Sequence, residues 1–168
     1  TGLYEKEFIS YKYPADEGLL PTSLRAQMLS GNCISPVLEE RRTRMSGETS
    51  SSSVMRTEYQ SNNYGHIKES ATYVKHNLSD PSGEVNQWDY KTEILAYDEK
   101  GNPTYVRDYT GNTTVYLWGY NRTYPIAVIS NSSYSLVSDN IQKDDTSESG
   151  YSQSSLDNLR GELPDSFV

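Results

Sequence analysis

The amino-acid sequence predicts a mainly β protein, an antiparallel meander of β-hairpins with one or two short helices. Runs rich in aromatic and β-branched residues alternate with turn-forming clusters, most clearly between Trp88 and Ile129. Only 34% of the 168 residues are hydrophobic, so the core must rely on amphipathic aromatic side chains. Fifteen of these aromatic residues are tyrosine, whose ring packs while its hydroxyl reaches water, as suits a thin sheet with wet faces.

The first part of the chain predicts one strand and one helix. Residues Leu3 to Tyr13 place apolar side chains at nearly alternate positions, and Pro14 ends this strand. Pro21 to Ser30 carries three apolar residues at helical spacing, with a proline at its start and the stop pair Gly31-Asn32 after it. The sequence therefore predicts an N-terminal strand followed by a helix.

Three strands are predicted next, separated by two polar connections. The first connection, Met45 to Ser52, contains a serine run that we expect to form a flexible hairpin tip. The second connection is a turn over Asn62 to Gly65. The strands that flank these connections are Val37–Arg44, Ser53–Tyr59 and Ile67–His76.

The central stretch predicts about four strands joined by tight turns. Thr92 to Tyr97 is expected to pair with Thr104 to Arg107 through a turn that begins at Asp98. The Asp98 carboxylate can accept backbone hydrogen bonds, and Gly101 can adopt the positive φ that ends a type I turn with a bulge. Two later turns, at 110–112 and 121–122, continue the meander.

The C-terminal part is more polar. Residues 142–153 cannot offset their ordering entropy by burial, which predicts a flexible loop. Residues 154–163 predict a short helix, with serine as the N-cap, leucines on one face and Pro164 as the stop. Because 19.0 kDa supports one moderate core, we expect residues 1–168 to form a single elongated β-rich module.

Two motifs resemble a known family. The run Tyr97-Asp98-Glu99-Lys100-Gly101-Asn102 resembles the Y-D-x-x-G-[RN] signature of RHS/YD-repeat proteins, long bacterial chains that form β-sheet shells at or outside the cell surface. The run YLWGYN at 116–121, followed by YPIA at 124–127, resembles a version found in RHS-like surface proteins of Bacteroides and relatives. The motif residues are Tyr97, Asp98, Gly101, Asn102, Gly119 and Pro125.

The resemblance implies that the chain is a fragment of a larger exported protein, secreted or held at the cell surface. Its partners would then be neighbouring repeats of the parent chain.

The formal net charge of −8 and a pI near 4.7 disfavour a nucleic-acid partner. No apolar run is long enough to cross a bilayer, so no membrane insertion is expected.

No residue set predicts catalysis, so we expect a non-enzymatic protein without a cofactor or a metal. The sequence lacks H-E-x-x-H, G-x-S-x-G and C-x-x-C motifs. His66 and His76 have no metal-ligand spacing, and Cys33 lies in no nucleophile motif. The segment 80–83 resembles the start of the D-P-x-G self-cleavage motif of RHS shells, but it also fits an ordinary type I turn, which we favour. A hydrolase is the weakest of the functional hypotheses.

Two stronger hypotheses concern the aromatic residues. If 115–120 form a strand, Tyr116, Trp118 and Tyr120 project from one face. Together with Trp88, they could stack on the sugar rings of a polysaccharide in a carbohydrate-binding module. The ligand could also be a protein. The same row could instead be covered by another layer in a structural or adhesive module, which we favour. Unpaired sheet edges also predict weak self-association.

Overall fold

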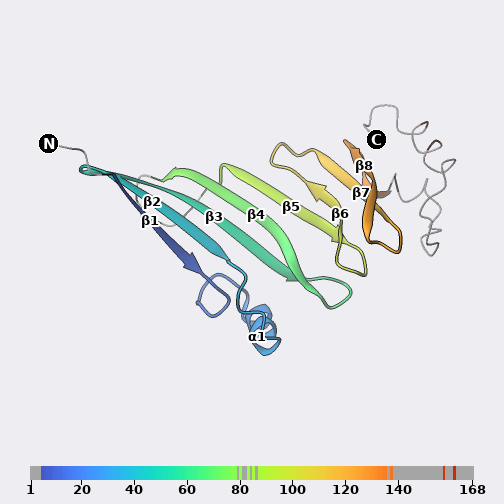
Figure 1. The fold of residues 1–168 in the computed structure, drawn as a ribbon, viewed down its shortest axis with the longest axis horizontal. Helices are drawn as coiled ribbons and strands as arrows, with labels where there is room; N and C mark the ends of the chain where they lie inside the picture. The colour runs from blue at the N-terminus through green and yellow to red at the C-terminus, as the bar shows by residue number, and fades with distance from the viewer. Residues whose placement is uncertain are drawn as a thin grey trace. The chain divides into compact units, whose positions relative to one another are not determined.

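The computed structural model describes residues 5–78, 80, 83, 85, 87–135, 137, 157 and 161 (Figure 1). The strands form a sheet in which spatial order follows chain order, from β1 to β8. The fold class is therefore confirmed as a mainly antiparallel β meander with one helix. The elements are β1 Glu5–Lys12, α1 Thr22–Ser30, β2 Glu39–Ser46, β3 Thr49–Ser61, β4 Ile67–Leu78, β5 Tyr90–Tyr97, β6 Pro103–Arg107, β7 Thr113–Gly119 and β8 Tyr124–Ser130.

Contacts between residues divide the chain into two compact units, Thr1–Thr92 and Glu93–Val168. The prediction that residues 1–168 form one elongated module stays a prediction.

In the first unit, β1, β2, β3 and β4 pair with their chain neighbours in antiparallel register. The helix α1 buries Leu24 and Met28, and the strands with their connections bury Leu38, Val54 and Ala71. Each of the leucine, valine and methionine side chains contributes about 1.5–3 kcal/mol when fully removed from water.

The connection between β2 and β3 differs from the prediction. Ser46 pairs with Thr49, so Gly47 and Glu48 form a two-residue hairpin turn, and the flexible loop expected at Met45 to Ser52 is wrong. Gly47 has φ +61 at the first central position, as a type II′ turn requires. The serine run extends the strand, and one of its hydroxyls has a partner across the sheet. Thr43 Oγ1 and Ser52 Oγ are hydrogen-bonded at 2.7 Å, and Ser52 is buried.

Three turns of the chain have the same internal hydrogen bonds. In the turn between β5 and β6, Asp98 Oδ1 accepts from the amides of Lys100 at 2.9 Å and Asn102 at 2.8 Å. Gly101 has φ +83 and donates to the Asp98 carbonyl at 3.0 Å, as the sequence predicts. Turn 62–66 between β3 and β4 and turn 108–112 between β6 and β7 repeat this pattern, with their glycines at φ +80 and +90. The sequence predicted a turn at each of the three places, but it predicted the hydrogen bonds to the aspartate side chain only for the turn at Asp98.

The second unit has its own core on β7 and β8. Val115 and Leu117 of β7 are buried with Ile129 of β8 and with Val137 beyond it. The alternation predicted for this strand is confirmed, because Val115, Leu117 and Gly119 are buried while Tyr116 and Trp118 are half-buried.

The loop predicted at 142–153 lies outside the described residues. So does the helix predicted at 154–163, apart from Asp157 and Gly161, which are helical. None of the helices described is long and apolar enough to cross a membrane.

Candidate functional site

The Asp98 turn holds the loop between β7 and β8 in the second unit. The side-chain amide of Asn102 donates to Asp98 Oδ2 at 3.0 Å and to the carbonyl of Arg122 at 2.8 Å. Lys100 Nζ donates to the carbonyl of Asn121, and Arg122 Nη1 forms an ion pair with Glu99 Oε1 at 3.0 Å.

The loop that it holds is strained. Tyr120, Asn121 and Arg122 have φ values of +51, +56 and +59. A left-handed conformation costs about 1–2 kcal/mol for each residue with a Cβ, and it rarely occurs in consecutive residues. Such a conformation persists where the surrounding structure over-determines it. The three contacts from the Asp98 turn, with the hydrogen bond from the Thr123 amide to the Gly119 carbonyl at 3.0 Å, supply that constraint.

Gly119 and Pro125 flank this loop at the ends of β7 and β8. Gly119 is buried and pairs with Tyr124, and Pro125 pairs with Trp118 next to a register shift in the ladder. Proline cannot donate to a ladder, so it fits an irregular position on a strand such as this one. Tyr97, the first residue of the motif, is half-buried at the end of β5, opposite Pro103.

The predicted aromatic row is only partly present. Tyr116 and Trp118 share a face of β7, but the indole Nε1 of Trp118 donates to the carbonyl of Pro103 at 2.8 Å, which fixes the ring against β6. Tyr120 lies in the strained loop, beyond the end of the strand, so its predicted place in the row is wrong. It packs edge-to-face against Tyr124 with a centroid distance of 6.3 Å. These two residues are 54% and 63% exposed, and the sequence named Tyr124 only as part of the motif at 124–127.

Trp88 belongs to the first unit and has different neighbours. Its side chain is half-buried, and its ring centroid lies 5.3 Å from that of Tyr73. The Arg56 guanidinium carbon lies over the Trp88 ring, 5.1 Å from its centroid, and Lys91 Nζ lies over the Tyr73 ring, 5.4 Å from its centroid. A cation over an aromatic face contributes about 0.5–1 kcal/mol at an exposed site. The Trp88 ring thus contacts side chains of its own unit.

A buried carboxylate organises the centre of the first unit. Glu39 is 2% exposed and accepts from Arg56 Nη2 at 2.6 Å, with Lys12 at 3.4 Å and Arg41 at 3.9 Å. Burial raises the pKa of Glu39, but the hydrogen bond and charge of Arg56 and the charge of Lys12 outweigh it, so the pKa lies below its usual value. Sequence reasoning missed this network because its members come from three strands.

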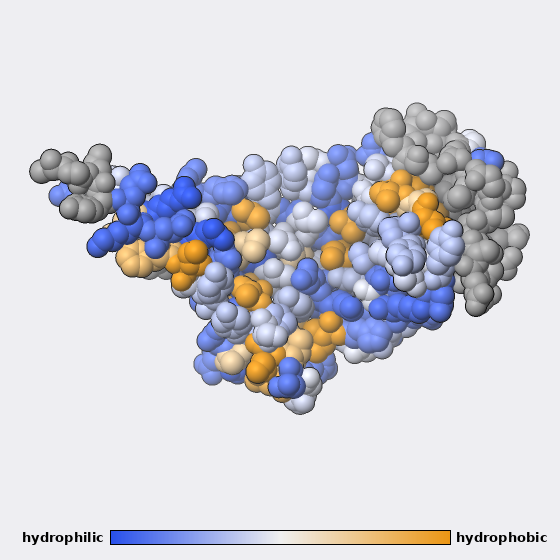
Figure 2. Space-filling model, in the orientation of Figure 1, coloured by the Kyte–Doolittle hydropathy of each residue, from blue (hydrophilic) through white to orange (hydrophobic). Residues whose placement is uncertain are grey.

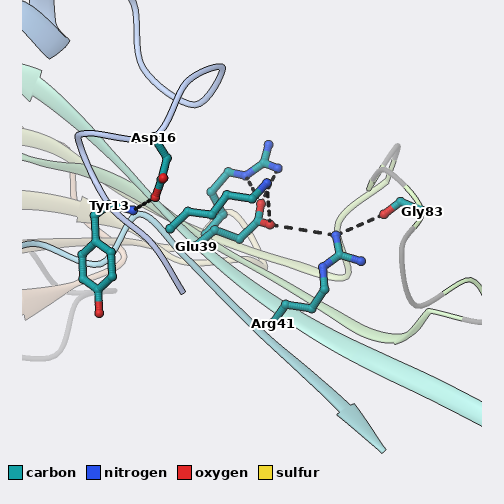
Figure 3. Close-up of polar contacts among 7 residues, drawn as sticks. Tyr13, Asp16, Glu39, Arg41 and Gly83 are labelled. Atoms are coloured by element: carbon teal, nitrogen blue, oxygen red, sulfur yellow. Dashed lines mark hydrogen bonds and ion pairs between the residues drawn. The ribbon is translucent and has the colours of Figure 1, made fainter. Parts of the chain in front are cut away.

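Arg41 connects this network to the connection after β4. Its Nη2 donates to the carbonyl of Gly83 at 3.1 Å (Figure 3). The amide of Gly83 donates to the carbonyl of Asp80 at 3.1 Å, which is the β-turn that we favoured for this segment. Figure 3 also shows Asp16 accepting from the amide of Tyr13, at 2.7 Å, where the chain leaves β1. These contacts are structural, because each polar group is used by another part of the same unit.

The two histidines and the cysteine have individual structural contacts in the part of the chain that the structure describes. No group of three or more histidine, cysteine, aspartate or glutamate residues there could hold a metal ion. The ring of His76 packs against Tyr90 at 5.7 Å, and the amide of His66 closes the turn at Asn62. Cys33 follows α1, where its amide donates to the carbonyl of Met28 at 2.8 Å.

No family model, curated protein or solved structure matches this chain. The features on which function can be argued are therefore the meander, its repeated turns, the strained loop with its two tyrosines, and the edge strand β1.

Proposed function

We propose that the chain is a non-enzymatic structural or adhesive β module of an exported RHS/YD-repeat-like protein, secreted or at a bacterial cell surface. Its role is to form part of an extended β scaffold, and its partners are neighbouring repeats of the parent chain. The observation that carries this proposal is the threefold use of one turn. An antiparallel meander with the same hydrogen-bonded turn at 62–66, 98–102 and 108–112 is how a repeating hairpin scaffold would be built.

The Tyr97-Asp98-x-x-Gly101-Asn102 motif fits this role. Its aspartate and asparagine form the turn, and the asparagine also holds the next hairpin loop through Arg122. A motif that closes its own hairpin and fixes the following one can be repeated along a chain. This local use of the motif residues supports a scaffold more than a ligand site.

A tandem fusion of two full copies tests the scaffold proposal. In repeat scaffolds each unit is stabilised by its neighbour, so the fusion should unfold at a higher thermal midpoint than the single copy. The comparison is made at a concentration where the single copy is monomeric by sedimentation. An equal midpoint for the fusion and the single copy would count against the scaffold proposal.

A carbohydrate-binding module is the second candidate, and the exposed pair Tyr120 and Tyr124 favours it. Two open rings on a loop of fixed conformation could stack on sugar rings. A glycan array probed with the wild type and with Tyr120→Ala separates the candidates. The scaffold proposal expects no retained glycan, whereas a glycan retained by the wild type and lost in Tyr120→Ala supports the binding module.

A further inference from the structure

Strand β1 exposes a row of backbone groups that no described strand pairs. The carbonyl of Lys12 accepts from the amide of Leu38 at 2.8 Å, so the backbone of Lys12 faces β2. Backbone groups alternate in direction along an antiparallel strand, and the β1–β2 register has no shift from Glu5 to Lys12. The N–H and C=O groups of Glu5, Glu7, Ile9 and Tyr11 therefore point away from β2, towards the open edge.

The side chains of β1 leave this edge accessible. All eight residues of the strand are exposed, and the strand contains no proline. Its centre, Phe8 to Tyr11, is uncharged and carries three large apolar or aromatic side chains. On the face shown in Figure 2, apolar side chains lie among hydrophilic ones. Natural sheets usually protect an edge by a bulge, a proline or central charges, and β1 has none of these.

We propose that β1 pairs with β1 of a second copy of the chain, antiparallel and about a twofold axis at Ile9. A symmetric antiparallel pair requires that residues with outward backbone groups face each other, which are the odd-numbered residues here. The axis at Ile9 places each Glu7 opposite Tyr11 of the other copy. Glu7 Oε1 already accepts from Arg44 Nε at 3.2 Å, and the tyrosine hydroxyl can donate to the second oxygen of the carboxylate. A parallel pair would instead place Glu5 and Glu7 beside their own copies.

The choice of a second copy as the partner follows from the charge order of the strand. Both glutamates lie in its first half, with Lys6 between them, and Lys12 lies at its end. Antiparallel pairing brings the acidic end of one copy beside the basic and tyrosine-bearing end of the other. Lys6 then lies opposite Lys12, whose charge is already partnered by Glu39 at 3.4 Å. The net charge of −8 opposes association, so added salt should strengthen the dimer.

Sedimentation velocity of the full chain across a salt series tests the dimer, with two variants matched in charge and exposure. Ile9 and Met55 are both 43% exposed, but Met55 lies on β3, which is paired on both sides. Ile9→Lys puts two like charges opposite each other at the axis and should lower the association constant roughly tenfold. Met55→Lys changes the net charge equally and should leave the association at or slightly above that of the wild type.

Cross-linking tests the register and shows whether a variant has failed for another reason. In a Cys33→Ser background, Ile9→Cys should form a disulfide-linked dimer on oxidation, because residues paired across an antiparallel ladder lie about 5.5 Å apart at Cα. Met55→Cys in the same background should remain monomeric. A dimer that is insensitive to Ile9→Lys, or equal cross-linking of both variants, would overturn the proposal. So would a wild type that stays monomeric at all salt concentrations. Because β1 pairing between the two copies would itself stabilise a tandem fusion, the scaffold test is read in a fusion that carries Ile9→Lys in both copies, and its failure is then separate from the failure of the dimer.

Discussion

Arg56 donates from both Nε and Nη2 to the same oxygen, Oε2 of Glu39, at 3.1 and 2.6 Å across the β2–β3 ladder. Its guanidinium also lies over the ring of Trp88 at 5.1 Å. One arginine thus links a buried carboxylate to the aromatic residue beyond β4. The contact joins parts of the chain far apart in sequence, and it makes Glu39 sensitive to substitution.

Glu39→Gln should lower the free energy of unfolding by about 2 kcal/mol, because it leaves Arg56 and Lys12 without their buried counter-charge. Urea unfolding measures this change. The matched control is Glu40→Gln, the next residue, which pairs with the exposed Arg42 at 2.5 Å and should change stability little. Equal losses in the two variants would show that the Glu39 network is not special.

The stability of the protein should fall in acid through the same residue. Since the folded-state pKa of Glu39 lies below its ordinary value of 4.5, its contribution is present above that value and is lost as pH falls through the lower folded-state pKa. The side-chain hydrogen bonds from Lys75 and Thr110 lower the pKa of Asp89 and Asp108, which act in the same direction. Unfolding of the wild type and Glu39→Gln at pH 7, 5 and 3 should show a difference that narrows with acid. A constant difference would contradict the assignment.

Gly101→Val and Gly47→Val should both destabilise the protein by about 1–2 kcal/mol, because both glycines have positive φ values, +83 and +61. The sequence predicts this effect only for Gly101, since it places Gly47 in a flexible loop. Thermal unfolding of both variants is the measurement. The control is Glu48→Val, at the other central position of the β2–β3 turn, which should have a much smaller effect. A negligible change for Gly47→Val would restore the flexible-loop prediction.

Asn102→Ala should loosen the loop between β7 and β8, because its amide holds the carbonyl of Arg122 at 2.8 Å. The expected cost is about 1 kcal/mol, with faster hydrogen exchange at the Thr123 amide. Asn112 occupies the equivalent position in turn 108–112, but its amide donates to Thr110 Oγ1 at 2.7 Å within that turn. Asn112→Ala should therefore leave exchange at Thr123 unchanged. Similar exchange in both variants would show that Asn102 does not hold the loop.

The local features of this protein follow from its sequence. The alternation of apolar residues predicted the strands, because a strand exposes its side chains to two faces in turn. A helix was predicted at Pro21 to Ser30 from its spacing and its stop signal, and α1 is Thr22–Ser30. The turn at Asp98 was predicted from the chemistry of aspartate and glycine. Each of these features depends on residues within a few positions of one another, so a sequence pattern contains the information.

Features that depend on pairing between distant residues were decided by the tertiary structure. The serine run after Gly47 is a strand because Thr43 and Ser52 meet across the sheet, and polar composition alone cannot show a cross-strand partner. Glu39 is buried because cations from β1 and β3 converge on it. Tyr120 leaves the aromatic row because contacts from a neighbouring turn hold its loop in a left-handed conformation. Local propensity disfavours that conformation, so only the contacts of the folded chain could reveal it.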